Sequence, residues 1–280
     1  MNIRQIMIWF VVFAGFLAAS AARAEPVALR VHQATAVPPR ITAYATVEDE
    51  TGASVTDVTA AQFSATVGDH PAKVETVHVF AASDEGLAYL FLVDLSRSLK
   101  DSEFTQLRKA LTEWIGTLRP QDRGALLTFS EQVRLEQDFT ADKAALQKKI
   151  TALRLHGQET HLHQGLIRAL ELGRRQGTDL PQRRVIVVFS DGMDDAIGNA
   201  TRTEVIEALK VDRVPIYAVG LYSPPKTAAK EQGLKALGEL ARLSGGGYQD
   251  GAATPLATAL AALRQRLGQT LVIPLHCTAC

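Results

Sequence analysis

The chain has little cysteine, no excess of charge of either sign and few aromatic residues. Only Cys277 and Cys280 are cysteine among 280 residues, which excludes a small domain held together by several disulfides. The 30 basic residues equal the 30 acidic residues. That balance argues against a nucleic-acid-binding protein, because affinity for a polyphosphate comes mainly from cationic side chains. With 46% hydrophobic residues the composition is that of an ordinary globular protein.

The sequence also lacks an apolar run of the roughly 20 residues that a membrane-spanning helix needs. Its N-terminal run, Ile6–Ala19, follows Arg4 and precedes the small-x-small sequence Ala22-Arg23-Ala24. These are the parts of a secretory signal. We interpret residues 1–24 as a signal peptide outside the fold, with an uncleaved anchor as the alternative. We therefore expect an exported protein, periplasmic or secreted, with no membrane span after cleavage.

Residues 25–85 have the pattern of a small β-rich module. Alternating or β-branched runs are separated by clusters of turn residues, which is typical of short strands. The predicted strands are Val27–His32, Ile41–Val47, Gln62–Val67 and Lys73–Phe80. A module of this size has a marginal core of its own, so we expect it to pack on its neighbour.

From residue 86 to residue 270 apolar runs alternate with segments of helical spacing. The predicted strands are Leu87–Val93, Ala125–Phe129, Val133–Phe139, Val185–Phe189 and Pro215–Gly220. The predicted helices are Phe104–Leu118, Lys143–Leu153, His161–Arg175, Glu204–Lys210, Leu234–Leu243 and Pro255–Leu267. Such alternation predicts an α/β domain with a doubly wound, mostly parallel, Rossmann-like sheet. The short connection before Val133–Phe139 predicts one antiparallel edge strand.

Residues 271–280 are predicted to form a C-terminal strand at Leu271–Ile273 followed by a Cys-x-x-Cys tail. Cys277 and Cys280 fit three interpretations: a redox pair, half of a zinc site or a local disulfide. Haem attachment is excluded, because His276 precedes the pair instead of following it. Export to an oxidising compartment favours the disulfide.

Polar side chains follow two of the predicted buried strands. Asp94, Ser96 and Ser98 alternate after the first strand, and Asp191 follows Val185–Phe189. Ligands of open α/β sheets bind beyond the carboxyl ends of the strands. Thr160, the predicted N-cap of the helix from His161, completes a set of two carboxylates and three hydroxyls. Such oxygen donors suit a hard cation, Mg²⁺ or alternatively Mn²⁺ or Ca²⁺.

In this order the five residues resemble the metal-ion-dependent adhesion site of von Willebrand factor type A (VWA) domains. The Asp-x-Ser-x-Ser motif of that family falls on Asp94, Ser96 and Ser98, its helix-opening Thr on Thr160 and its later Asp on Asp191. The resemblance covers about Leu87–Leu267. The leading β region is similar to that of bacterial secreted members. The resemblance implies a VWA fold and a metal site that binds an Asp or Glu of a protein partner.

Four neighbouring residues are candidates for partner binding. Arg97 stands where the family often has a small residue, so it either crowds the loop or attracts an anionic partner. Glu159, Asp194 and Asp195 add carboxylates near the five ligands, with a solvated acidic loop as the alternative for the last two. A zinc pair formed by His161 and His163 is disfavoured, since residues two apart on a helix point about 200° away from each other.

We expect an exported adhesion or assembly module, not an enzyme, that captures a partner's carboxylate with a divalent cation. One alternative is a structural scaffold with a non-essential metal site, in which the β region mediates contacts. The other is an Mg²⁺-dependent hydrolase. That enzyme needs a base beside the metal, for which Glu159, Asp195 and His161 are the candidates. No phosphate-binding glycine-rich loop with a lysine follows the first strand.

Overall fold

The chain divides into two compact units. The computed structural model describes residues 8–12, 25–37, 39–195, 200–222, 225, 227–251 and 255–280. One unit combines Met1–Asp84 with Gln265–Cys280, and the other is Glu85–Arg264. The sequence pattern separates residues 271–280 as a tail, whereas the contacts group them with the N-terminal strands.

The unit Glu85–Arg264 is built around a six-stranded sheet of strand order β12-β11-β10-β7-β8-β9. In that order the strands are β12 (Gly247–Asp250), β11 (Ile216–Gly220), β10 (Arg183–Ser190), β7 (Leu87–Asp94), β8 (Arg123–Phe129) and β9 (Val133–Thr140). All neighbouring pairs are parallel except β8 and β9. The predicted doubly wound, mostly parallel sheet with one antiparallel edge strand is therefore confirmed.

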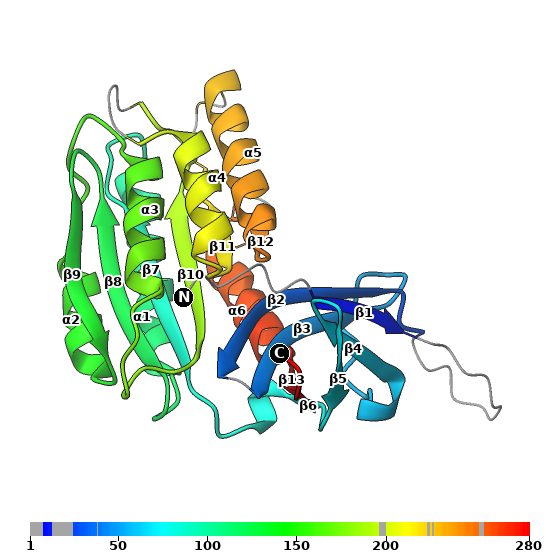
Figure 1. Cartoon of the computed structure of the whole chain (residues 1–280). Helices are drawn as coiled ribbons and strands as arrows, with labels where there is room; N and C mark the ends of the chain where they lie inside the picture. Colours follow the sequence, from blue (N-terminus) through cyan, green and yellow to red (C-terminus); the bar gives the residue numbers. More distant parts are fainter. Residues whose placement is uncertain are drawn as a thin grey trace. The chain divides into compact units, whose positions relative to one another are not determined.

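Helices cover both faces of this sheet, with α3, α4 and α5 on one side and α1 and α2 on the other (Figure 1). The helices are α1 (Asp101–Gly116), α2 (Lys143–Ala152), α3 (Leu162–Gly173), α4 (Arg202–Val211), α5 (Ala228–Leu243) and α6 (Leu256–Gly268). Except for α3, which comes after α2, each helix follows a strand or a strand pair, as expected for alternating runs. The last helix, α6, continues across residue 264 into the segment that belongs to the other unit.

The two faces of the central strand β7 are packed differently. Every residue from Leu87 to Asp94 is buried. Leu90 and Leu92 join the apolar core shared with α3, α4 and α5. On the other face Trp114 of α1 meets the ring of Phe91 edge-on, with 5.4 Å between ring centroids. Strands buried on both sides read as continuous apolar runs, which is why the sequence predicts them well.

Two elements of this unit differ from the prediction. The strand β12 is not predicted, because its four residues contain no apolar run and it pairs with β11 through the backbone. Helix α5 begins at Ala228, six residues before the predicted start at Leu234. Its N-cap is Thr227, whose side chain accepts a hydrogen bond from the backbone N–H of Lys230. Tertiary pairing and a capping residue thus extend the structure beyond the apolar pattern.

The unit Met1–Asp84 with Gln265–Cys280 contains a seven-stranded sheet of order β1-β4-β5-β13-β3-β2, with β6 also paired to β13. The strands are β1 (Ile8–Val12), β2 (Ala28–Val37), β3 (Arg40–Glu48), β4 (Phe63–Val67), β5 (His70–Val74), β6 (His78–Val79) and β13 (Leu271–His276). Short 3₁₀ turns, η1 (Ala60–Gln62) and η2 (Phe80–Ala82), accompany them. The C-terminal strand β13 lies in the middle of this sheet.

The position of β13 explains a difference from the predicted strands. The run Lys73–Phe80 is predicted as one strand, but β5 ends at Val74 and β6 covers only His78–Val79. Both pair with the same strand, since Val74 lies opposite Leu275 and Val79 opposite Leu271. The other edge of β13 pairs with β3. One run is therefore divided into two short strands along a single partner.

Both ends of this unit bear on the expectations from sequence. The predicted signal peptide falls on residues 1–24, of which 1–7 and 13–24 lie outside the described residues. Ile8–Val12, expected outside the fold, pair with β4 as an antiparallel strand. At the other end Cys277 and Cys280 form a disulfide in the structure. Over the described parts of the chain, no helix has both the length and the apolar character required to cross a membrane.

Candidate metal centre

The carboxyl ends of β7 and β10 bring the first predicted ligands together. The two strands are parallel neighbours, and Val93 lies opposite Phe189. The next residues, Asp94 and Ser190, therefore lie side by side, and the Ser190 hydroxyl donates a 2.7 Å hydrogen bond to Asp94 Oδ2. Asp191 follows directly. The sheet thus places two carboxylates at the edge where α/β proteins bind their ligands.

Asp94 is held by a chain of hydroxyl groups. Its Oδ1 accepts hydrogen bonds from the backbone N–H of Ser96 at 2.9 Å and from the Ser96 hydroxyl at 2.6 Å. Ser96 Oγ lies 2.8 Å from Ser98 Oγ, within hydrogen-bond distance. Asp94 and Ser96 are buried and Ser98 is half-buried. The alternation of Asp94, Ser96 and Ser98 thus aims three side chains at one point, as the sequence predicts.

Asp191 is fully buried but incompletely satisfied. Its Oδ1 accepts a hydrogen bond from the backbone N–H of Met193 at 3.2 Å. Its Oδ2 accepts no hydrogen bond from any residue that the structure describes. The nearest charge of opposite sign is Lys230 of α5, whose Nζ lies 3.6 Å from Asp191 Oδ2 and donates a 3.0 Å hydrogen bond to the carbonyl of Ser98. A buried carboxylate oxygen without a donor is costly unless a cation neutralises it.

Burial and a neighbouring negative charge perturb the pKa of Asp94. Burial, reinforced by the negative charge of Asp191, raises the pKa of Asp94 to about 7. The hydrogen bonds from Ser96 and Ser190 act in the opposite direction and are outweighed. Both effects arise because two side chains that ionise to negative carboxylates are buried close together, away from water. A cation between them would offset both effects, because it stabilises the ionised form of each carboxylate.

Thr160, the fourth predicted ligand by position, is buried and tied to the loop that follows Asp191. Its backbone N–H donates a 2.5 Å hydrogen bond to Asp195 Oδ1, and its carbonyl accepts one from the backbone N–H of Asp195 at 3.3 Å. The prediction that Thr160 is the N-cap is wrong by one residue. The N-cap of α3 is His161, which makes no capping hydrogen bond with its side chain. The Thr160 side chain is therefore not committed to capping.

The acidic loop after Asp191 performs the capping instead. Asp194 Oδ2 accepts a 2.7 Å hydrogen bond from the backbone N–H of His163. The same oxygen lies 2.7 Å from Nδ1 of the His163 ring. Asp194 and Asp195 together hold the start of α3, so they are positioning residues and not part of a freely solvated loop. An acidic side chain at a helix N-terminus is electrostatically favourable.

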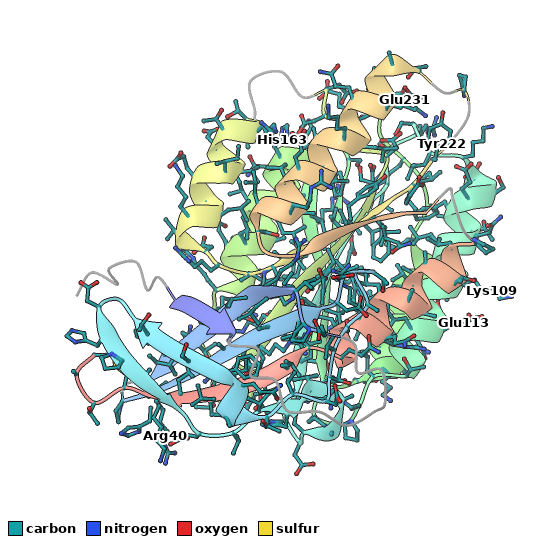
Figure 2. All side chains as sticks on the ribbon, turned by 90° about the vertical axis from the view of Figure 1, so that its right-hand side faces the viewer. Arg40, Lys109, Glu113, His163, Tyr222 and Glu231 are labelled. Atoms are coloured by element: carbon teal, nitrogen blue, oxygen red, sulfur yellow. A yellow bond between two sulfur atoms is a disulfide. The ribbon has the colours of Figure 1, made fainter. Side chains whose placement is uncertain are left out.

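Two further candidates for partner binding lie near this edge. Arg97 is exposed, and its backbone N–H donates a 3.3 Å hydrogen bond to the carbonyl of Gly157. The Glu159 carboxylate is exposed and lies 3.1 Å from His161 Nε2. In Figure 2 His163, Tyr222 and Glu231 mark this end of the unit, at the starts of α3 and α5 and after β11.

The residues present fit a divalent cation. The described residues contain no cluster of three or more His, Cys, Asp or Glu side chains able to hold a metal, so a site here depends on hydroxyl ligands. Two carboxylates and three hydroxyls give an all-oxygen donor set, which suits Mg²⁺, Mn²⁺ or Ca²⁺. The unsatisfied Asp191 Oδ2 and the raised pKa of Asp94 both indicate a place where positive charge is stabilised.

Two residues of the site are not among the predicted ones. Ser190 was open to prediction, because it immediately precedes Asp191 at the end of a buried strand, and its hydroxyl supports Asp94. Lys230 was not predicted as a site residue, because the predicted helix begins only at Leu234. Thr227 followed by Ala-Ala-Lys-Glu is the sequence signal for the earlier start, since Thr is a favoured N-cap.

A doubly wound α/β domain with acidic and hydroxyl side chains at its carboxyl edge defines a class of ligand-binding module. Residues 90–245 match the family model of the von Willebrand factor type A domain. The chain therefore belongs to the VWA family. Domains of this family commonly mediate interactions between proteins.

The curated relatives match about half of this chain and a small part of their own length. The chain is 26% identical over 143 residues to inter-alpha-trypsin inhibitor heavy chain H1 of Bos taurus, covering 47% of this chain. The corresponding protein of Homo sapiens is 25% identical over 143 residues. In both cases the match spans only 16% of the relative's length. The functions of those whole proteins are thus not carried over.

Solved structures support the fold. The vWF domain of the type V pili tip protein Mfa5 from Porphyromonas gingivalis aligns with a TM-score of 0.51 and 13% identity, over 66% of this chain and 96% of that one. Proximal thread matrix protein 1 of the mussel byssus gives 0.52 and 16%, over 64% and 47%. A von Willebrand factor type A protein from Catenulispora acidiphila gives 0.51 and 14%, over 89% and 51%.

Proposed function

We propose that the chain is an exported, cation-dependent protein-binding module whose VWA domain carries a metal-ion-dependent adhesion site. The ligands are the five side chains identified from the sequence, namely Asp94, Ser96, Ser98, Thr160 and Asp191. The cation is Mg²⁺, with Mn²⁺ and Ca²⁺ as alternatives. An Asp or Glu carboxylate of the partner completes the coordination of the cation, which supplies the attraction for that anion.

One observation carries this proposal: Asp191 Oδ2 is buried beside a second buried acid and accepts no hydrogen bond from the described residues. Two desolvated carboxylates at one point require positive charge, and the single ammonium of Lys230, 3.6 Å from Asp191 Oδ2, donates no hydrogen bond to that oxygen. A divalent cation held by two carboxylates and neutral hydroxyls keeps enough Lewis acidity to attract a further carboxylate. Family membership adds support from an independent direction.

The surroundings of the site assign roles to the remaining candidates. Arg97 is exposed next to two ligands, where its charge attracts an acidic partner. Glu159 is exposed at the start of α3 and offers a polar contact to the partner. Asp194 and Asp195 act one step away from the partner, because they fix Thr160 and the helix that follows it.

The experiment is titration of residues 25–280 with Mn²⁺ alone, by calorimetry, for the wild type and Asp94→Ala. We expect one saturable site in the wild type and none in the variant. Asp138→Ala is the control, because Asp138 is an exposed carboxylate paired to Arg175 on the outer strand β9. Absence of binding in the wild type, or equal binding by Asp94→Ala, would refute the metal site and leave the scaffold role.

Capture of a carboxylate is tested with acetate as the probe. Bound Mn²⁺ is paramagnetic, so it broadens the NMR signal of any acetate that coordinates to it. We expect broadening of the acetate methyl signal by Mn²⁺-loaded wild type and by Asp138→Ala, beyond that caused by Mn²⁺ in buffer. An Mn²⁺-loaded protein that leaves acetate at the buffer value lacks an open coordination position, which contradicts carboxylate capture.

We further propose binding without catalysis. The residues that an Mg²⁺-dependent hydrolase would use as a base are engaged elsewhere: Asp195 holds Thr160, and His161 pairs with Glu159. The expected result is no Mg²⁺-dependent hydrolysis of p-nitrophenyl phosphate or of casein above the level of Asp94→Ala. Turnover by the wild type that this substitution abolishes would restore the enzyme hypothesis.

Export to the periplasm or the exterior of a bacterium is also part of the proposal, with residues 25–85 as a leading β module. The charge, apolar run and small-x-small sequence of residues 1–24 support it, as does the Cys277–Cys280 disulfide. Expression of the full chain in a Gram-negative host tests it. Mass spectrometry of the periplasmic fraction should find a chain that begins at Glu25, and retention of residues 1–24 on a cytoplasmic product contradicts it.

A further inference from the structure

Lys230 stands at a place where a helix disfavours positive charge. It lies in the first turn of α5, with its backbone N–H bound to the N-cap side chain of Thr227 at 3.3 Å. The N-terminus of a helix carries a partial positive charge, so a lysine there is destabilising unless something else compensates. The local helix therefore gives no reason for this residue.

The compensation comes from the metal ligands. Lys230 Nζ donates a 3.0 Å hydrogen bond to the carbonyl of Ser98 and lies 3.6 Å from Asp191 Oδ2. Its side chain is only 13% exposed, and that of Asp191 is not exposed at all. The ammonium group thus gives up much of its hydration to reach the buried Asp191 carboxylate. It contacts one predicted ligand through its carbonyl and another through its carboxylate.

Two glycines, Gly192 and Gly233, allow α5 to lie close to the loop that carries Asp191. A Cβ atom on Gly192, the residue after Asp191, would lie 2.3 Å from the carbonyl carbon of Gly233 in α5. A Cβ atom on Gly233 would lie 2.5 Å from the carbonyl oxygen of Gly192. The loop that carries Asp191 and the first turns of α5 therefore pack backbone to backbone. Figure 2 places Glu231, the neighbour of Lys230, at this end of α5.

We propose that the Lys230 ammonium is a resident counter-ion of the Asp191 carboxylate, which a divalent cation must displace in order to bind. This inference rests on the proposed metal site and adds how that site is regulated. The lysine stem has four flexible carbons, so the ammonium can move into solvent without movement of α5. The metal-free protein is then stabilised by Lys230, and the affinity for the cation is lowered by it.

The consequences have opposite signs in the two states. Without metal, removal of the ammonium leaves the buried Asp191 carboxylate uncompensated, which lowers the stability of the protein. With metal, removal of the ammonium abolishes a like-charge repulsion and a competitor for the same oxygens. A lysine with a merely structural role would, when removed, lower stability in both states.

The test compares the wild type with Lys230→Met and Lys230→Gln, using residues 25–280 and Mn²⁺ as the probe. We expect Mn²⁺ to bind the variants at least about tenfold more tightly. Melting temperatures in EDTA should fall in both variants, while the rise caused by saturating Mn²⁺ should be larger than in the wild type. Lys235→Met is the matched control, because Lys235 is an exposed lysine of the same helix.

A second measurement needs no variant. Acetylation of the wild type by a small excess of acetic anhydride, read by mass spectrometry, reports how accessible each lysine is. Addition of saturating Mg²⁺ should raise the extent of modification of Lys230 severalfold and leave that of Lys235 unchanged. If Mg²⁺ leaves the extent of acetylation of Lys230 unchanged, or lowers it, the proposed displacement of the ammonium by the cation is wrong.

The outcomes separate this inference from the proposed function. Equal or weaker Mn²⁺ binding by Lys230→Met and Lys230→Gln overturns the counter-ion role while the metal site stands. Failure of the wild type and of both variants to bind Mn²⁺ overturns both proposals. Tighter binding by the two variants, with Lys235→Met at the wild-type value, establishes the competition.

Discussion

At the scale of single residues, the proposed metal site implies that a proton and the cation compete for Asp94. Burial and the charge of Asp191 raise the pKa of Asp94 to about 7, against an ordinary value of 3.8. Near neutral pH the metal-free carboxyl is therefore partly protonated. A cation ligand must be deprotonated, so we expect the binding of metal to release this proton.

This competition predicts the pH dependence of metal affinity. Below pH 7 the dissociation constant for Mn²⁺ should rise by up to about tenfold per pH unit, because one proton must leave for each cation bound. Above pH 7 it should level off. Calorimetric titrations between pH 5.5 and pH 8 measure the slope. An affinity that does not vary across this range would show that Asp94 is already ionised in the metal-free protein.

Stability without metal should follow the opposite trend. The folded state binds a proton at Asp94 that the unfolded state has already lost between about pH 4 and pH 7, so unfolding becomes easier as pH rises through this window. The free energy of unfolding in EDTA, measured by urea titration, should fall with pH more steeply in the wild type than in Asp94→Asn. The amide of that variant does not titrate. Parallel curves for the two proteins would contradict the raised pKa.

At the level of residues, the sequence allows inference of proximity where chemistry and position coincide. Asp94, Ser96, Ser98 and Asp191 follow buried strands, and parallel strands must end at one edge, so their proximity could be inferred without a structure. Lys230 could not be inferred in this way. Its role depends on where α5 lies across the sheet, which no pattern within residues 227–234 reveals.

At the scale of elements, the contact between α5 and the loop that follows β10 positions Lys230, the proposed counter-charge. Gly192 has a φ of +79° and lies against the backbone of Gly233. A side chain at Gly192 would have to displace a helix backbone, not a flexible side chain. We therefore infer that the close backbone contact between Gly192 and Gly233 sets the distance between Asp191 and Lys230.

The substitution Gly192→Ala tests this backbone contact, and Gly52→Ala is the matched control. Gly52 has the same φ of +79°, and nothing lies within 4 Å of a Cβ placed there. Gly52→Ala should cost only the left-handed conformation, about 1 kcal/mol. Gly192→Ala adds a backbone clash, for which we expect a total of about 3 kcal/mol or more. Chemical denaturation measures the loss of unfolding free energy in each variant. Equal losses for Gly52→Ala and Gly192→Ala would contradict a tight backbone contact at Gly192.

The predictable elements are those with strong local patterns. The buried strands β7 and β10 appear as continuous apolar runs, and α1 appears at its helical spacing. In contrast, β12 is defined by pairing with β11, and the first turns of α5 by a cap at Thr227. Elements fixed by a distant partner or a single side chain are the ones that periodicity misses.

At the scale of the whole molecule, one unit is assembled from both ends of the chain. The C-terminal run from Leu271 was recognisable as a strand from sequence. Its place between β3 and β5 was not, because strand pairing across more than 200 residues leaves no local signal. Residues 25–85 alone therefore lack the middle strand of their own sheet, and a fragment of that span does not test the function of the β module.

Truncation of the C-terminus gives the corresponding prediction. A chain of residues 25–270 loses β13, whose side chains Leu271, Ile273 and Leu275 are buried and whose backbone pairs on both edges. Loss of even two such side chains costs on the order of 5 kcal/mol, comparable to the stability of a whole domain. By hydrogen exchange, the amides of β3 should lose their protection, while those of β7 and β10 keep it.

A chain of residues 25–276 is the control for this truncation, since it removes the disulfide and keeps β13. We expect β3 to stay protected in it, because a disulfide that closes so short a loop contributes only about 2 kcal/mol. Mn²⁺ binding should persist in both truncated chains, because every predicted ligand lies in Glu85–Arg264. Retained protection of β3 without β13 would show that the module folds from its N-terminal strands alone. Loss of Mn²⁺ binding together with β13 would show that the metal site depends on the other unit.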